Sequence, residues 1–452
     1  MNKIFHYKER NSSILKEVLG GIIVFFAMIY ILPVNASILS DCGGNYQAVF
    51  IATALCSGIC CMLMGLFANY PIVISAGMGM SAYLAYTVCG SFGYSFEQAL
   101  LLVFISGLLF LILTLTSLRE KIIQAIPPSL KYAVSAGLGG FICFVGLKNG
   151  GIIEKSSSTF VQLGDFSNPT VLLSLFGIVL ALVLMQIKGK IGKLSIIIAM
   201  IVTALFGLLL NALGIENMPK FTKTNTLENF SSFIDNVGLC FHKDAWAIFV
   251  KPETYAILFS LIFVQIFDTT ATLIAVGKKV GIMDEKGQLI GVRKAMLADS
   301  FGSVFCGPIG TSTLTSFAES TIGVESGART GLSACVTGLL FLLSPFLYPI
   351  FSIFSGVANG LTPVTSLALV SVGCLMFSNL KNIDWNDTII IITSFLMILL
   401  MILCYSISDG LGLSIILYCL MMLFAKRGKE VPIMLYGIGA FFILGYILKI
   451  IV

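Results

Sequence analysis

The sequence predicts an all-α polytopic membrane protein with fourteen transmembrane spans, arranged as two inverted repeats of seven spans. The chain has a mean hydropathy of +1.00. Hydrophobic residues make up 57% of its 452 residues and charged residues only 11%. Apolar segments of spanning length recur along the whole chain, and one segment in each half is interrupted by glycines at a corresponding place. These three observations exclude a large soluble domain.

Fourteen apolar segments are long enough to cross a bilayer. The first seven cover residues 18–38, 47–68, 70–89, 96–117, 130–148, 170–187 and 193–214. The second seven cover residues 254–277, 294–308, 310–325, 329–354, 360–380, 388–405 and 409–425. A further apolar stretch at 431–451 predicts an extra C-terminal helix, which either spans the membrane or lies along its surface.

The apolar segments divide the chain into five parts. These are a cytoplasmic N-terminal tail at 1–17, a first repeat at 18–214, an external loop at 215–253, a second repeat at 254–425, and a basic segment with an apolar helix at 426–452. Lys and Arg residues precede the first span and follow the fourth, sixth, eighth, twelfth and fourteenth spans. Cytoplasmic loops carry such an excess, so a multi-pass cell-membrane protein with a cytoplasmic N-terminus is expected. The tail has no cleavage signature of a signal peptide.

Composition also argues against several functions. The net charge of +5 is small and its basic residues lie between apolar runs, so nucleic acid is not an expected partner. The twelve cysteines are scattered, without paired CxxC motifs or clustered histidines, so no metal site or other cofactor is expected. Cys42 and Cys240 both fall on the predicted outer side, but nothing indicates that they meet. No catalytic residues are expected, because the chain lacks the DDxxD motif that a membrane prenyltransferase would need.

Two segments do not have the pattern of an ordinary transmembrane helix. Residues 71–83 begin with Pro71 and β-like residues and then carry glycines, and residues 308–319 do the same after Pro308. Each is the third span of its half. Interrupted spans at corresponding positions are typical of inverted-repeat transporters, in which freed backbone groups meet a substrate near the membrane midplane.

Asp268, Asp299 and Glu319 are acidic residues within predicted apolar spans, away from the span ends or beside the glycine-interrupted segment. Burying a carboxylate in a membrane is costly, so such groups usually face a polar cavity, a partner or a substrate path. Asp268 and Glu319 could accept N–H bonds from a flat heterocycle and could carry a coupled proton. Asp299 is a further proton-coupling candidate, although contact with a neighbouring helix is the stronger interpretation for it. The two histidines, His6 and His242, lie outside the spans, and sodium coupling stays open.

Several motifs resemble those of the AzgA-like purine permeases of the nucleobase:cation symporter-2 superfamily. The resemblance covers about residues 15–425. It rests on Phe267-Asp268-Thr269-Thr270-Ala271-Thr272-Leu273, Gly310-Thr311-Ser312-Thr313, Ala318-Glu319-Ser320, Arg329-Thr330-Gly331-Leu332, Ala76-Gly77-Met78-Gly79-Met80, Met28-Ile29-Tyr30-Ile31 and Val34-Asn35.

The resemblance implies a core domain of spans 1–4 and 8–11 and a gate domain of spans 5–7 and 12–14. It places a purine base between short strands of spans 3 and 10, bound by acids of spans 8 and 10, with uptake generally by proton symport. The implied binding residues are Asp268, Glu319, Ala318, Ser81, Thr272, Gly77 and Met78. A homodimer is left open.

The chain departs from the family pattern at several positions. Ser81 stands where the family usually has Asn, Ala271 stands for a Gly, and Thr272 stands where uracil-type relatives carry His. The preferred base is therefore not determined by the sequence. A carrier of xanthine, uracil or an inorganic anion on the same fold and a channel are the alternatives, although two acids disfavour an anion site.

Overall fold

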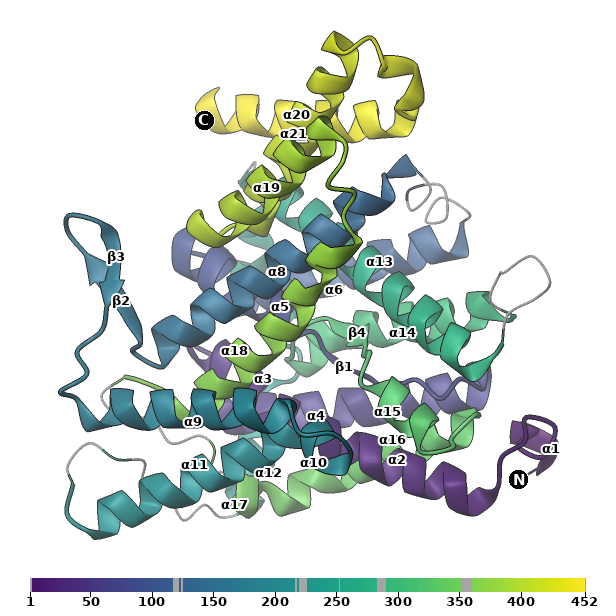
Figure 1. Ribbon diagram of the computed structural model, residues 1–452, viewed down its shortest axis with the longest axis vertical. Coiled ribbons are helices and arrows are strands. Elements are labelled where there is room, and N and C mark those ends of the chain that lie inside the picture. The colour runs from purple at the N-terminus through teal and green to yellow at the C-terminus, as the bar shows by residue number, and fades with distance from the viewer. Residues whose placement is uncertain are drawn as a thin grey trace.

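The computed structural model describes residues 2–116, 122, 125–215, 218, 226–251, 253–282, 290–351, 354 and 360–451 (Figure 1). Helices dominate it, as the sequence predicts. Within these residues seven helices are long and apolar enough to cross a membrane by length and composition, or up to eight if a bent pair is counted as one span. The other predicted spans are shorter, broken or more polar helices.

The first core group follows a short N-terminal helix, α1 (Asn2–Phe5). The first span, predicted at 18–38, runs from Ile14 to Ser40 and consists of α2 (Ile14–Met28) and α3 (Ile31–Ser40), separated only by a turn at Ile29 and Tyr30. The remaining elements are α4 (Tyr46–Leu63) with its π-helical end η1 (Met64–Ala68), β1 (Ile74–Ala76), α5 (Met78–Ala82), the π-helical η2 (Tyr83–Ser91) and α6 (Phe96–Leu115).

The second core group repeats this order. Its elements are α13 (Glu253–Val280), α14 (Val292–Ile309), β4 (Leu314–Ser316), α15 (Ser320–Glu325), α16 (Gly331–Leu343), η5 (Ser344–Leu347) and α17 (Tyr348–Phe351). As in the first repeat, a strand precedes a short helix in the third span. Glycines and hydroxyl residues, rather than a continuous apolar run, precede both short helices.

A second set of helices forms the gate group. From the first repeat these are α8 (Pro128–Asn149), α9 (Pro169–Met185), α10 (Lys190–Lys193) and α11 (Ser195–Ala212). From the second repeat they are α18 (Pro363–Phe377), η7 (Ser378–Asn382), α19 (Thr388–Leu403) and α20 (Ile407–Phe424). An outer hairpin of β2 (Ile153–Ser156) and β3 (Phe160–Leu163) joins α8 to α9 and was not predicted.

Helix packing has the symmetry expected of two inverted repeats. In the core, α4 (span 2) packs on α16 (span 11), and α6 (span 4) packs on α14 (span 9). In the gate, α8 packs on its counterpart α18, α19 packs on α8, and α9 packs on α18. Exchanging the two halves converts the α4–α16 pair into the α14–α6 pair and the α8–α19 pair into the α18–α9 pair, and it leaves the α8–α18 pair unchanged, which supports the repeat organisation.

Glycines allow several of these close helix contacts. A Cβ atom on Gly139 would lie 2.7 Å from the Gly373 carbonyl oxygen, and one on Gly137 would lie 2.6 Å from Met401 Sδ. Small residues permit this approach of helices in a membrane. The glycines of α8 therefore act in helix packing.

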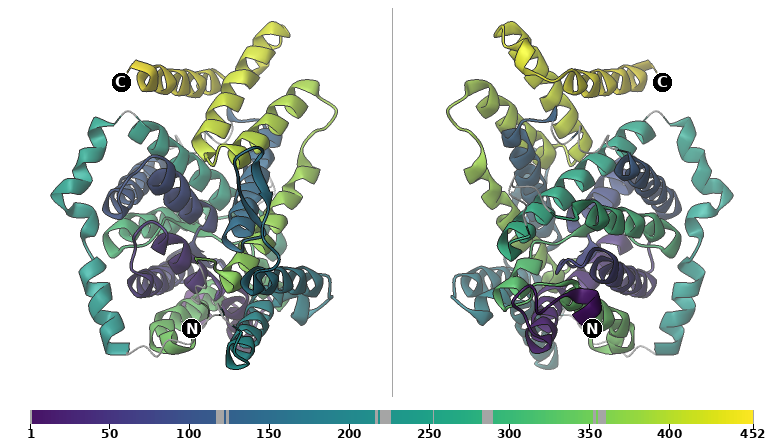
Figure 2. Two further views of the ribbon diagram at one scale, coloured as in Figure 1. Left: turned by 90° about the vertical axis from the view of Figure 1, so that its left-hand side faces the viewer. Right: turned by 90° about the vertical axis from the view of Figure 1, so that its right-hand side faces the viewer.

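The connection between the repeats is helical where it is described. It contains α12 (Thr226–Asn236), η3 (Leu239–Phe241) and η4 (Lys243–Val250), which run along one flank of the core group (Figure 2). The Asn236 side chain donates to the Gly310 carbonyl at 3.1 Å, and the Gly238 N–H donates to the Pro308 carbonyl at 2.7 Å. These bonds satisfy carbonyl groups at the C-terminal end of α14 that have no partner within the helix.

The predicted C-terminal apolar helix is α21 (Ile433–Ile451), which follows the short η8 (Gly428–Glu430). It runs antiparallel to α20. Cys419 Sγ lies 3.8 Å from the Leu435 carbonyl oxygen, and the Tyr446 hydroxyl donates to the Asp409 carbonyl at 3.4 Å. The two contacts are separated by a similar number of residues on α20 and on α21, so α21 lies beside α20 along most of its length.

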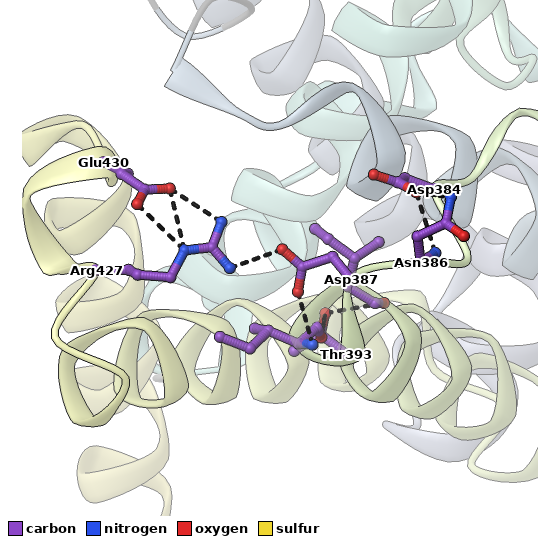
Figure 3. A network of polar contacts seen from close by, with 8 residues as sticks. Asp384, Asn386, Asp387, Thr393, Arg427 and Glu430 are labelled. Carbon is purple, nitrogen blue, oxygen red and sulfur yellow. Dashed lines mark hydrogen bonds and ion pairs between the residues drawn. The ribbon is translucent and has the colours of Figure 1, made fainter.

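A polar network fixes the ends of α19 and α20 that the charge pattern places in the cytoplasm (Figure 3). Arg427 donates to Asp387 Oδ2 at 2.7 Å and to Glu430 Oε2 at 3.0 Å. Asp387 also accepts the Ile389 N–H at 2.9 Å as the N-cap of α19. The hydrogen bond from Arg427 holds the pKa of Asp387 below its usual range.

We expect Asp387→Asn to lower the melting temperature of purified protein at pH 7. A carboxylate whose pKa is depressed by folding contributes stability above its unfolded pKa, about 3.9, and loses it as pH falls through the folded value. The difference between parent and variant should therefore shrink between about pH 4 and pH 3. The exposed acid variant Asp244→Asn is the control. A difference that does not change with pH would contradict this account.

Candidate functional site

The predicted extended segments of spans 3 and 10 meet as a two-stranded antiparallel pair. Ile74, Ser75 and Ala76 of β1 lie opposite Ser316, Thr315 and Leu314 of β4, and all six residues are buried. Two further backbone bonds extend the pair, from Gly77 N–H to the Thr313 carbonyl at 3.1 Å and from Phe317 N–H to the Val73 carbonyl at 3.0 Å. Each strand leads straight into a short helix, so both half-helices begin beside the same strand crossing.

Glu319 is the N-cap residue of α15, immediately after β4. Its side chain is partly exposed, and the adjacent Ala318 is exposed. Tyr30, at the break between α2 and α3, is fully buried and donates its hydroxyl to Glu319 Oε1 at 3.4 Å. The first span therefore contacts the carboxylate of Glu319 through one of its two oxygens.

Asp268 projects from α13, which packs against both β4 and α15. It is partly exposed and makes no hydrogen bond or ion pair with other residues in the described part of the chain. The rings of Phe263 and Phe267 on the same helix contact each other in a tilted arrangement, with centroids 4.6 Å apart. Thr272, one turn further along α13, is buried with 8% exposure. The carboxylate of Asp268 is therefore available to accept hydrogen bonds.

Asp299 lies behind these two acids and is fully buried. Thr269 of α13 donates to its Oδ2 at 2.7 Å, and Ser316 of β4 donates to its Oδ1 at 3.3 Å. The carboxylate thereby ties α14 to α13 and to the strand pair. This placement agrees with the interpretation that Asp299 contacts a neighbouring helix. Thr269, which donates to Asp299, directly follows Asp268 on α13.

Ser81 belongs to a buried polar cluster rather than to an open surface. Its hydroxyl lies 2.7 Å from Ser312 Oγ, donates to Asn35 Oδ1 at 2.5 Å and lies 3.0 Å from the Gly77 carbonyl. The Asn35 amide donates in turn to Thr53 at 2.8 Å. In this conformation Ser81 joins spans 1, 3 and 10, and its single hydroxyl proton is used within the cluster.

Gly77 and Met78 form the start of α5, and both are buried. A Cβ atom on Gly77 would lie 3.1 Å from the Thr315 side chain. One on Gly79 would lie 2.6 Å from Leu138 of α8. The end of the strand crossing is therefore packed directly against the gate, so a shift of the core relative to the gate would change the surroundings of the site.

A second core–gate connection lies on the side predicted to be cytoplasmic. Glu325 at the end of α15 is paired with Lys193 of α10 and with Lys279 of α13. Lys193 belongs to the gate, whereas Glu325 and Lys279 belong to the core. Exposed ion pairs contribute roughly 0–1 kcal/mol each, so this connection can be broken easily during a conformational change.

Among the described residues, no group of three or more His, Cys, Asp and Glu side chains is placed to hold a metal ion. His6 lies 2.9 Å from Glu9, and His242 lies 3.4 Å from Glu97, both in exposed positions outside the spans. The twelve cysteines are free, Cys42 and Cys240 included. The chemistry available at the site is therefore that of carboxylates, hydroxyl groups and backbone amides.

Three residues of the site region were not predicted as site residues. Tyr30 and Asn35 occur in the motifs that carried the resemblance, and both are polar-tipped residues flanking Pro33 in an apolar span. Gln265 is fully buried and donates to the Leu314 carbonyl at 3.1 Å, which anchors β4 to α13. The sequence did contain a signal for Gln265, because it places a polar amide side chain inside an apolar span.

Two inverted repeats, a core and a gate, and a paired strand crossing with carboxylates beside it define a membrane transporter. The model of the Permease family matches residues 15–409, and the chain belongs to this family. It is therefore a permease and not an enzyme, and the resemblance seen in the motifs is confirmed.

Curated relatives align over nearly the whole chain. The guanine/hypoxanthine permease PbuG of Bacillus subtilis is 39% identical, covering 99% of this chain and 99% of the relative. The adenine permease AdeQ of Escherichia coli is 32% identical, covering 99% and 96%. Among solved structures, the transmembrane domain of the cyanobacterial bicarbonate transporter BicA has a TM-score of 0.60 at 14% identity, covering 88% of this chain and 97% of that domain. That likeness concerns the fold alone.

Proposed function

We propose that the protein imports purine bases (adenine, guanine or hypoxanthine) across the cell membrane by proton symport. The observation that carries this proposal is the placement of two partly exposed carboxylates, Asp268 and Glu319, beside the β1–β4 crossing. Purine rings present N–H donors along a flat edge, and ionised carboxylates are strong acceptors for them. The names of the aligned relatives point to the same class of substrate.

The proposed binding mode uses groups at the strand crossing. Glu319, with one oxygen held by Tyr30, offers the other oxygen to a ring N–H. Asp268 offers a second acceptor from the neighbouring helix, with Ala318 against the face of the base. An inorganic anion on the same fold would instead require a cation at this position, which makes the anion-carrier alternative weaker.

Proton coupling would run through the acids. The histidines lie outside the spans, so Asp268, Glu319 and Asp299 are the groups that could exchange a proton inside them. Alternating access would move the core, which carries both acids, relative to the gate. The contact of Gly79 with Leu138 and the ion pair of Glu325 with Lys193 would change during this movement.

Uptake measurements test both parts of the proposal. Labelled adenine, hypoxanthine, guanine, xanthine and uracil are offered to a transport-deficient host, with and without a protonophore. We expect saturable uptake of at least one purine base and its loss when the proton gradient collapses. Membrane-inserted protein without saturable uptake of any purine would refute the substrate class. Uptake that survives the protonophore but requires sodium would refute only the proton coupling.

A further inference from the structure

The first span contacts β4 at both of its ends. Before the strand, the Asn35 amide donates a hydrogen bond to Thr311 Oγ1 at 3.0 Å. After the strand, the Tyr30 hydroxyl donates to Glu319 Oε1 at 3.4 Å. Asn35 and Tyr30 both belong to the span that runs from Ile14 to Ser40. One element of the first repeat therefore sets where the strand of the second repeat lies, together with the acid that follows it.

Asn35 forms the firmer of the two anchors. Its side chain is fully buried, and its amide also donates to Thr53 Oγ1 at 2.8 Å. Its carbonyl oxygen accepts from Ser81 at 2.5 Å and from Ser312 at 3.1 Å. An asparagine side chain has two N–H donors and one oxygen with two lone pairs, so all of its hydrogen-bonding capacity is used. A fully satisfied buried network of this kind is rigid, and it fixes the start of β4.

The helix that carries Glu319 also packs closely on the first span. A Cβ atom on Gly323 of α15 would lie 2.7 Å from Val24 Cγ2, and one on Gly20 would lie 3.2 Å from the Gly323 carbonyl oxygen. Tyr30, on the same span, is fully buried. The last side-chain torsion of a glutamate has only a broad preference of its own. The hydrogen bond from Tyr30 therefore restricts the rotation of the Glu319 carboxyl group.

The bond from Tyr30 orients this carboxylate without filling it. An ionised carboxylate offers about four acceptor positions, and a hydroxyl donor occupies one of them. A base with two adjacent N–H groups uses both oxygens of a carboxylate, which requires that the two planes coincide. Guanine presents such an edge, a ring N–H beside an exocyclic amino group, whereas hypoxanthine presents the ring N–H alone. A fixed carboxylate plane therefore matters more for guanine than for hypoxanthine.

We propose that Tyr30 is a positioning residue that holds the plane of the Glu319 carboxylate for the paired N–H groups of guanine. This inference rests on the proposed function and adds a determinant of selectivity among purine bases. Tyr30 would act through Glu319 rather than by touching the base. Asn35 would support the same arrangement from the other end of β4, by keeping the strand in register with the first span.

Inhibition of uptake by unlabelled guanine and unlabelled hypoxanthine tests this proposal in cells that express the parent or Tyr30→Phe. Labelled hypoxanthine is the transported probe, and labelled adenine replaces it if the parent does not take up hypoxanthine. Tyr30→Phe removes one hydroxyl group and keeps the buried ring. We expect the half-inhibitory concentration of guanine to rise about three- to tenfold, which corresponds to roughly 0.7–1.4 kcal/mol, and that of hypoxanthine to rise less than about twofold. The maximal uptake rate per surface protein should stay at the parent level.

Two further variants separate positioning from general loosening of the fold. Tyr446→Phe is the matched control, because it removes a hydroxyl group that donates at the same distance, 3.4 Å, to the Asp409 carbonyl on a different helix pair. It should match the parent. Asn35→Ser shortens the anchor but leaves the Ser81–Ser312 and Thr53–Thr311 bonds in place. It loosens β4 without freeing the carboxyl group, so it should weaken the inhibition by both bases by a similar factor.

The ratio of the two half-inhibitory concentrations does not depend on the amount of folded protein, so it reports selectivity even if a variant is less abundant. Equal changes for both bases in Tyr30→Phe, no change, or a parent that guanine does not inhibit would each overturn the proposal. An equally large change of this ratio in Asn35→Ser would also overturn it, since selectivity would then belong to the strand as a whole. Absence of saturable purine uptake in the parent would instead refute the proposed function.

Discussion

Glu319→Gln and Asp268→Asn should each reduce purine uptake about 10- to 150-fold while leaving the amount of folded protein near that of the parent. Each replacement exchanges a carboxylate acceptor for an amide whose N–H group faces the donors of the base. A hydrogen bond to a charged group contributes roughly 1.5–3 kcal/mol, which corresponds to that range in affinity. Both side chains are partly exposed at the site, so the isosteric changes should not disturb packing.

Uptake rates, normalised to the surface amount of each variant, measure this effect. Glu154→Gln in the exposed outer hairpin and Asp244→Asn in η4 are the matched controls, because they make the same chemical changes far from the strand crossing. Asp299→Asn should reduce uptake less than the two site variants. Uptake near the parent level in Glu319→Gln or Asp268→Asn would assign that acid to helix packing instead.

Gly331→Leu should greatly reduce the amount of folded protein. Gly331 begins α16 at its crossing with η1, and a Cβ atom there would lie 2.1 Å from the Gly65 carbonyl oxygen and 2.7 Å from Gly65 Cα. The neighbouring atoms belong to the backbone and cannot rotate away. Overpacking of this kind costs typically 1–3 kcal/mol and sometimes more, and we expect a value at the upper end.

Size-exclusion profiles and melting temperatures of detergent-solubilised protein measure the effect of this substitution. Gly437→Leu is the matched control, since a Cβ atom on Gly437 of α21 would meet nothing within 4 Å. The control should behave as the parent does. A Gly331→Leu protein with the parent's melting temperature would mean that spans 2 and 11 do not approach each other as closely as described.

Hydropathy predicted where the spans lie, but their ends and breaks depend on local interactions that hydropathy does not report. The span expected at 254–277 is α13, Glu253–Val280, and the span expected at 409–425 is α20, Ile407–Phe424. The first span is one apolar unit from Ile14 to Ser40, as expected, but a turn at Ile29 and Tyr30 divides it into two helices. Pro33, which has no N–H to donate to the Ile29 carbonyl one turn earlier, was the signal for this interruption in the sequence.

The sequence by itself determined the class of protein and its candidate acids. Apolar runs of spanning length, glycine-interrupted third spans and carboxylates in an apolar context each follow from the cost of placing polar groups in a bilayer. Tertiary structure decided which of these groups meet. Tyr30 reaches Glu319, and Asn35 reaches Ser81, across chain separations that carry no local signal. It also placed α21 along α20, because helix association depends on surface shape rather than on hydropathy.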